Sequence, residues 1–101
     1  MSGLAVHSWE LLSSEVEPDL ILDIRSHDQF LRGHLPGAVN LPYERFQAEA
    51  ESMAASADNV LVVDPAGARA AEMAVWLRGR GLNVRYLKGG MSTWRGPLEA
   101  K

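Results

Sequence analysis

The sequence predicts a single α/β domain, spanning residues 1–101, in which a five-stranded parallel sheet is flanked by helices in three layers. Short apolar segments that resemble strands alternate with segments that resemble helices along the chain. Two of the strand segments are apolar almost throughout, which is typical of strands covered on both faces of a parallel sheet. Alternation of this kind within 101 residues implies one sheet built with right-handed crossovers.

Five segments are expected to form the strands. They are rich in β-branched or aliphatic residues and are bounded by turn-forming residues such as glycine and proline. In chain order these segments are residues 4–7, 20–24, 38–41, 60–63 and 84–87.

The intervening segments carry helical signals. A first short helix is expected from Trp9. Ser26, followed three residues later by Gln29, fits a capping box ahead of a short helix that Gly33 would end. Residues 43–55 are rich in Ala and Glu and place apolar side chains near one face. The segment after residue 67 has apolar residues at helical spacing and then two glycines: Ala70, Met73, Ala74, Leu77, Gly79 and Gly81.

Composition excludes several classes of function. The formal net charge is −3 and the ten Lys and Arg residues are scattered, which argues against nucleic acid or an anionic membrane as a partner. The chain contains no cysteine, so it can form no disulfide, thiolate metal site, persulfide or cysteine nucleophile. No apolar run approaches a membrane-spanning length, and no secretory signal precedes the first strand. We therefore expect a soluble, cytoplasmic protein.

Three segments carry specific motifs. Residues 22–42 contain DIR and GHLPGAVN, residues 60–84 run from a buried strand through a turn into a helix, and residues 86–99 contain GGMSTW. In this order and at this spacing they resemble the rhodanese-like domains. The resemblance implies a five-stranded parallel sheet flanked by helices, with a six-residue loop between the fourth strand and the next helix.

In active members of that family the loop begins with a cysteine and ends with a basic or hydroxyl residue. The cysteine takes a sulfane sulfur from thiosulfate or a similar donor as a persulfide and passes it to a nucleophile such as cyanide or another thiol. In this sequence the glycine and the final arginine of the loop match the family, but the cysteine does not. The loop residues are Asp64, Pro65, Ala66, Gly67, Ala68 and Arg69.

A loop wrapped ahead of a helix N-terminus points backbone N–H groups inward and favours an anion. Asp64 supplies a permanent anion whose two oxygens can accept those N–H groups, so we expect it to fill the loop itself. Pro65 lacks an N–H group, and Ala66 and Ala68 offer no polar side chain. Carboxylate catalysis would need a metal with further carboxylates or a second carboxyl nearby, and the loop supplies neither. We expect a degenerate loop with no catalytic residue.

Two roles can be considered for each charged residue near the loop. Arg25 could clamp an anion, but an ion pair with Asp23 that fixes the strand-to-helix turn is favoured. Arg69 could hold an anion or pair with Asp64, and both alternatives stay open. Gly67, whose backbone N–H belongs to the loop, is a third candidate for contact with an anion or a partner.

Histidine and tryptophan are expected to have structural roles. No Ser or Cys is available for His34 to activate, so a structural hydrogen bond is favoured over general-base catalysis. The three histidines lack the spacing of helical metal sites, and neither a metal nor a cofactor is expected. Trp94, after the glycine pair, is expected to anchor the last helix in the core. Trp76 could cover an edge of the core or lie exposed at a contact surface.

These observations predict a catalytically silent rhodanese-like domain with a binding, regulatory or scaffolding role toward a protein partner whose identity the sequence does not give. The alternative is a sulfurtransferase-related protein that binds a sulfur anion or another oxyanion at residues 64–69, or supports a partner's thiol. Whether Asp64 is natural or was introduced in place of a cysteine is left open.

Overall fold

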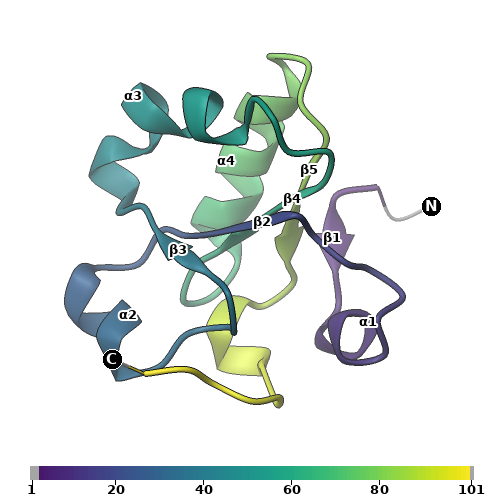
Figure 1. The fold of residues 1–101 in the computed structure, drawn as a ribbon, viewed down its shortest axis with the longest axis vertical. Helices are drawn as coiled ribbons and strands as arrows, with labels where there is room; N and C mark the ends of the chain where they lie inside the picture. Colours follow the sequence, from purple (N-terminus) through teal and green to yellow (C-terminus); the bar gives the residue numbers. More distant parts are fainter. Residues whose placement is uncertain (1–2, 101) are drawn as a thin grey trace.

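The computed structural model describes residues 3–100 as one parallel sheet with helices on both faces. The strand order is β1-β5-β4-β2-β3, and every neighbouring pair is parallel (Figure 1). This is the predicted fold. The strands are β1 (Ala5–Val6), β2 (Leu20–Asp23), β3 (Val39–Asn40), β4 (Val60–Val63) and β5 (Val84–Leu87).

The predicted helices are also present, with β and α elements alternating in chain order. The Ser26 and Gln29 capping box opens the second helix, and Gly33 ends it. Both edge strands are two residues long, shorter than predicted, because helices begin almost at once after them. The helices are α1 (Ser8–Leu12), α2 (His27–Arg32), α3 (Tyr43–Ala54), α4 (Ala68–Arg78) and the 3-10 helix η1 (Gly90–Thr93).

The position of β4 in the middle of the sheet explains why its sequence is apolar throughout. All four of its residues are buried, and alternate side chains point to opposite faces of the sheet. Val60 and Val62 join the larger apolar cluster, which includes Phe46 of α3 and Leu77 of α4. The other two residues, Leu61 and Val63, join a smaller cluster on the opposite face. The sheet is therefore covered by α3 and α4 on one face and by shorter elements on the other.

The turn before η1 fixes the loop that follows β4. Gly90 has a φ of 62°, a left-handed conformation that favours glycine. A Cβ atom on Gly90 would clash with the carbonyl oxygen of Asp64 and would lie 2.6 Å from the nitrogen of Ala66. The next two residues bind the loop, since Met91 N donates to Asp64 O at 2.8 Å and Ser92 N donates to Pro65 O at 3.0 Å. The sheet and the glycine turn thus hold the loop from both sides.

We expect Gly90→Ala to lower the free energy of unfolding by about 2–4 kcal/mol, because the new methyl group is strained and displaces the loop backbone. Gly81→Ala is the matched control. Gly81 also has a positive φ of 90°, but nothing lies within 4 Å of its added Cβ atom. That control should lose only the backbone term, about 1 kcal/mol. Urea unfolding of both variants checks this, and equal losses would contradict the close approach at Gly90.

A second prediction concerns an exposed ion pair on α3. Arg45 Nε donates to Glu49 Oε2 at 2.7 Å, and Nη2 donates to Oε1 at 2.9 Å. The hydrogen bond from Arg45 lowers the pKa of the Glu49 carboxyl below its ordinary value, and the charge of Arg45 adds to this effect. Because this folded-state pKa is depressed, the pair stabilises the fold above the ordinary glutamate pKa and loses its effect as pH falls through the lowered value.

Arg45→Gln should therefore raise the pKa of Glu49 toward the value of an unpaired glutamate. The carboxyl carbon chemical shift of Glu49, followed by NMR from neutral to acid pH, measures this directly. An unchanged titration midpoint in the variant would show that the pair does not persist in solution.

Candidate functional site

Asp64 lies where β4 ends and the loop to α4 begins, at the carboxyl edge of the sheet. Asp64 is buried, with 2% of its surface exposed. Oδ1 accepts the N–H of Gly67 at 2.5 Å, and Oδ2 accepts the N–H groups of Arg69 at 3.0 Å and Ala70 at 3.1 Å. The loop is thus wrapped around the carboxylate of its own first residue.

Local geometry explains why these N–H groups converge. Gly67 precedes α4 with a φ of 105°, and a Cβ atom there would lie 3.0 Å from the nitrogen of Gly89. The first N–H groups of a helix have no partner within the helix, and Gly67 has no side chain that could cap them. Asp64 supplies the missing acceptor. Its negative charge is also favoured by the dipole of α4.

The rest of the loop presents little chemistry to solvent. Pro65, Ala66 and Ala68 are exposed, and none of them carries a polar side-chain atom. Both carboxylate oxygens of Asp64 are occupied by backbone donors. Arg69 is the one exposed loop residue that has a charged side chain.

The guanidinium group of Arg69 does not pair with Asp64, although the backbone N–H of Arg69 donates to it. Within residues 3–100 no ion pair joins them, and the guanidinium carbon of Arg69 lies 4.2 Å from the centroid of the Tyr43 ring. The pairing that the sequence left open is therefore wrong, because Asp64 points inward to the amides while Arg69 lies over an aromatic ring at the start of α3. Tyr43 was not predicted as part of this site, and no local pattern links it to a residue so far along the chain.

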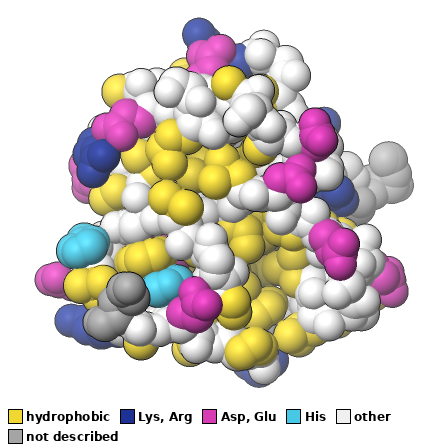
Figure 2. Space-filling view, viewed as in Figure 1, with side chains coloured by type: hydrophobic (Ala, Val, Ile, Leu, Met, Phe, Trp, Pro, Cys, Tyr) yellow, Lys and Arg dark blue, Asp and Glu magenta, His cyan; other side chains and the backbone are white. Residues whose placement is uncertain are grey.

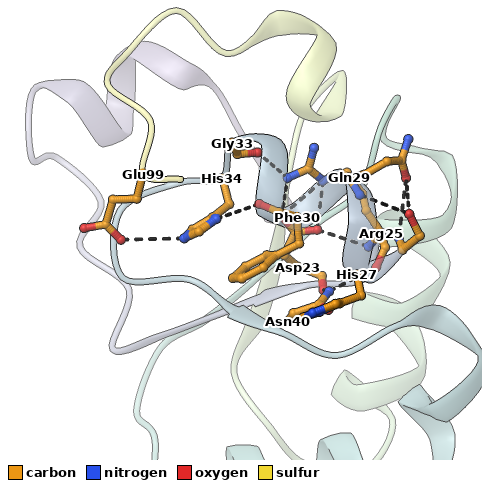
Figure 3. Close-up of polar contacts among 10 residues, drawn as sticks. Asp23, Arg25, His27, Gln29, Phe30, Gly33, His34, Asn40 and Glu99 are labelled. Atoms are coloured by element: carbon orange, nitrogen blue, oxygen red, sulfur yellow. Dashed lines mark hydrogen bonds and ion pairs between the residues drawn. The ribbon is translucent and has the colours of Figure 1, made fainter. Parts of the chain in front are cut away.

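Arg25 is bound on two sides, as Figure 3 shows. Its Nε lies 2.9 Å from Oδ1 of Asp23, and its Nη2 lies 2.7 Å from Oδ2 and 2.8 Å from the carbonyl oxygen of Gly33. The Asp23 side chain is 1% exposed and that of Arg25 is 10% exposed. Asn40 donates to the carbonyls of both residues at 3.0 Å. The pair therefore joins the end of β2 to β3 and to the end of α2.

His34 is buried beside the same network. Its Nδ1 lies 2.8 Å from the carbonyl oxygen of Phe30, and its ring stacks on the Phe30 ring with centroids 3.7 Å apart (Figure 3). The backbone of His34 also exchanges two hydrogen bonds with Glu99, each of 2.9 Å. His34 thus holds the C-terminal segment, a contact that sequence analysis missed because its two partners are far apart in the chain.

Trp94 and Trp76 are both partly buried. Trp94 packs against the smaller apolar cluster, and its indole nitrogen donates to the carbonyl oxygen of Pro97 at 2.9 Å. Trp76 meets the ring of Phe46 edge-on, with centroids 6.3 Å apart, and Arg80 lies over its outer side. Of the two alternatives for Trp76, the structure shows the one that covers an edge of the core.

Two further features concern the whole described part of the chain. Among residues 3–100, no three His, Asp or Glu side chains gather closely enough to hold a metal ion. Over the same residues, no helix combines the length and apolar character needed to cross a membrane.

Comparisons with known proteins agree on one family. The family model described as the rhodanese-like domain matches residues 8–97. No curated protein matches the sequence. Similar solved structures include a rhodanese-like domain protein from Staphylococcus aureus, with 25% identity, a TM-score of 0.82 and coverage of 97% of this chain and 98% of that chain. The rhodanese-like domain of an Anabaena protein has 26% identity and a TM-score of 0.77, covering 100% and 81% of the two chains.

A rhodanese-related protein from Thermoplasma volcanium, 19% identical with a TM-score of 0.85 and coverage of 97% and 99%, shares the fold. Together the five-stranded parallel sheet, the loop after β4 and the match over residues 8–97 show that the chain belongs to the rhodanese-like domain family, although it contains no cysteine.

Proposed function

We propose that this chain is a catalytically silent rhodanese-like domain that acts by binding, in a regulatory or scaffolding role. The observation that carries the proposal is the buried Asp64 carboxylate, which accepts the backbone N–H groups of Gly67, Arg69 and Ala70. It stands at the loop position where active relatives are expected to carry the sulfur-accepting cysteine. The cytoplasmic location expected from the composition stays a prediction.

Sulfur transfer through this chain has no acceptor atom. A persulfide requires a thiolate, and the sequence has no cysteine. An incoming thiosulfate would also have to displace Asp64 from three charge-assisted hydrogen bonds. Because the carboxylate is attached to the loop, it competes without the entropy loss that a free anion pays on binding.

Asp64 is also poorly placed to act as a nucleophile itself. A carboxylate nucleophile needs an accessible oxygen lone pair aimed at the substrate. Here the residue is 2% exposed and each oxygen is directed to backbone donors. The arrangement supports an anchoring role for Asp64 at the N-terminus of α4.

A second candidate function is support of a sulfur anion or of a partner's thiol beside the loop. A hollow of about 360 Å³ is lined by both Arg25 and Arg32, and by Gln29, Gly33, Met91 and Leu98. Asp23 and Gly33 occupy Nε and Nη2 of Arg25, and no described residue accepts a hydrogen bond from its Nη1. Two guanidinium groups in one hollow would favour an oxyanion or a thiolate.

The first test is sulfur transfer. The purified protein, incubated with thiosulfate and cyanide, should form thiocyanate at the background rate only. Asp64→Cys should gain a persulfide from thiosulfate, with release of sulfite, because the three N–H groups would then stabilise a thiolate. Mass spectrometry detects the added sulfur atom.

Ser52→Cys is the control for this test, since it places a thiol on the exposed surface of α3 away from the inward N–H groups. It should gain sulfur much more slowly than Asp64→Cys. Turnover by the unmodified protein would contradict the proposal. A folded Asp64→Cys variant no more reactive than Ser52→Cys would show that the loop is silent for reasons beyond Asp64.

The second test asks whether the loop is filled by its own side chain. Asp64→Ala leaves three N–H groups without an acceptor and should lower the free energy of unfolding by about 2–4 kcal/mol. Thiosulfate or sulfate should restore part of that loss, because an anion can then enter the loop. Denaturant unfolding with and without each anion, together with calorimetry, measures both effects.

Glu72→Ala is the matched control, because it removes one exposed carboxylate from α4 without opening the loop. Neither this control nor the unmodified protein should respond to thiosulfate at the loop. Equal affinity of the unmodified protein and Asp64→Ala for thiosulfate would rule out self-occupation.

A further inference from the structure

The sheet face opposite α3 and α4 carries an open apolar groove, which we call the α1 groove. It lies between α1, β2 and the C-terminal segment and has a volume of about 320 Å³. It opens over the smaller apolar cluster, and Figure 2 shows hydrophobic side chains along a hollow in this part of the molecule. Its lining residues are Leu11, Leu12, Val16, Glu17, Pro18, Ile21, Leu35, Pro36, Trp94 and Pro97.

Apolar side chains of α1 remain in contact with solvent, both in the lining of the groove and one turn away from it. Leu12 is 49% exposed and Trp9, one turn earlier on α1, is 56% exposed. None of the residues of α1 is buried. A single exposed apolar residue is ordinary, but a groove with a mostly apolar lining, in which Leu12 is half exposed, is a surface of the kind that marks an interaction site.

Acidic residues predominate around the α1 groove, and the basic exception is the exposed Arg95. Glu17 is the one charged residue in its lining, and neither Lys nor Arg occurs in residues 8–24. On the other side, a carboxylate oxygen of Glu99 accepts the N–H of Gly37, next to Pro36 of the lining. Figure 2 shows acidic side chains on both sides of the hollow. Arg95, adjacent to Trp94, donates to the carbonyls of Ser92 and Trp94.

We propose that the α1 groove binds an amphipathic segment of a partner protein, whose apolar face enters the groove and whose Lys or Arg side chains meet the acidic border. An apolar centre with complementary charge around it is the usual arrangement of a peptide-binding surface. The acidic border disfavours an anionic lipid surface. A symmetric contact between two copies would bring the same acidic borders together, in chains of net charge −3.

This site is independent of the loop after β4, since none of residues 64–69 lines the groove. The proposal extends the binding role inferred above, but it does not depend on the silence of the loop. Sulfur-transfer activity would leave the groove untouched, and failure of the groove to bind would leave Asp64 in its place.

The probe is a synthetic helical peptide of about 14 residues, long enough for about four turns. One version carries leucine on one face and lysine on the other, and a second replaces every lysine by glutamate. Each is titrated into the ¹⁵N-labelled full chain. The indole N–H of Trp94 reports on the groove, while those of Trp9 and Trp76 show whether binding spreads to α1 or occurs elsewhere.

We expect the lysine peptide to shift the Trp94 indole signal and the backbone signals of Leu12 and Ile21, while the glutamate peptide does not. Glu15 is exposed and adjacent to Val16 of the lining. The double variant Glu15→Lys with Glu17→Lys should weaken lysine-peptide binding at least about tenfold at low salt and should favour the glutamate peptide. Glu44→Lys with Glu72→Lys is the control. It changes the net charge equally at exposed residues outside the groove and should leave the affinity within about twofold.

Leu12→Gln tests the apolar part and should weaken binding, whereas Val75→Gln, at a residue of α4 that is 56% exposed and outside the lining, should not. The proposal is overturned if neither peptide binds at millimolar concentration, if both bind equally, or if the shifts map to another surface. Sedimentation of the free protein as a dimer, with the Trp94 signal changing on dilution, would assign the groove to a second copy and also overturn it.

Discussion

The three hydrogen bonds that the Asp64 carboxylate accepts from the loop and the first turn of α4 are the constraint on which this site depends. They bring the end of the central strand and the start of α4 to a common acceptor, so the turn between them has one geometry. The helix that begins there buries Ala70, Ala74 and Leu77 against the sheet. A change at Asp64 therefore reaches both the chemistry of the loop and the packing of a core helix.

The same physics that suits this architecture to anion chemistry makes a fixed carboxylate effective in it. Converging N–H groups and a helix dipole stabilise negative charge of any origin. When the charge belongs to the chain, the donors are satisfied in the folded state without a ligand. The turn at Gly90 packs against this loop through backbone contacts, so the loop has little freedom to open and exchange its carboxylate for another anion.

The sequence predicted those features whose cause is local. The apolar run of β4, the capping box of Ser26 and Gln29, and the close spacing of Asp23 and Arg25 each act within a few residues. The position of Asp64 followed from motif spacing. The Tyr43 ring under Arg69 and the clasp between His34 and Glu99 depend instead on how distant segments meet, and no periodicity records such contacts. The α1 groove was missed for the same reason.

The groove forms because the helices that cover the two faces of the sheet differ in length. Alternation along β4 makes both faces apolar, so both require cover. One face receives α3 and α4, of 12 and 11 residues, and the other receives α1 and η1, of five and four residues. Short elements cover less area, and the uncovered remainder is the groove. The backbone N–H groups near Asp64 already have an acceptor within the chain. The apolar surface that the fold leaves exposed to water lies on this second face, where a partner can bury it.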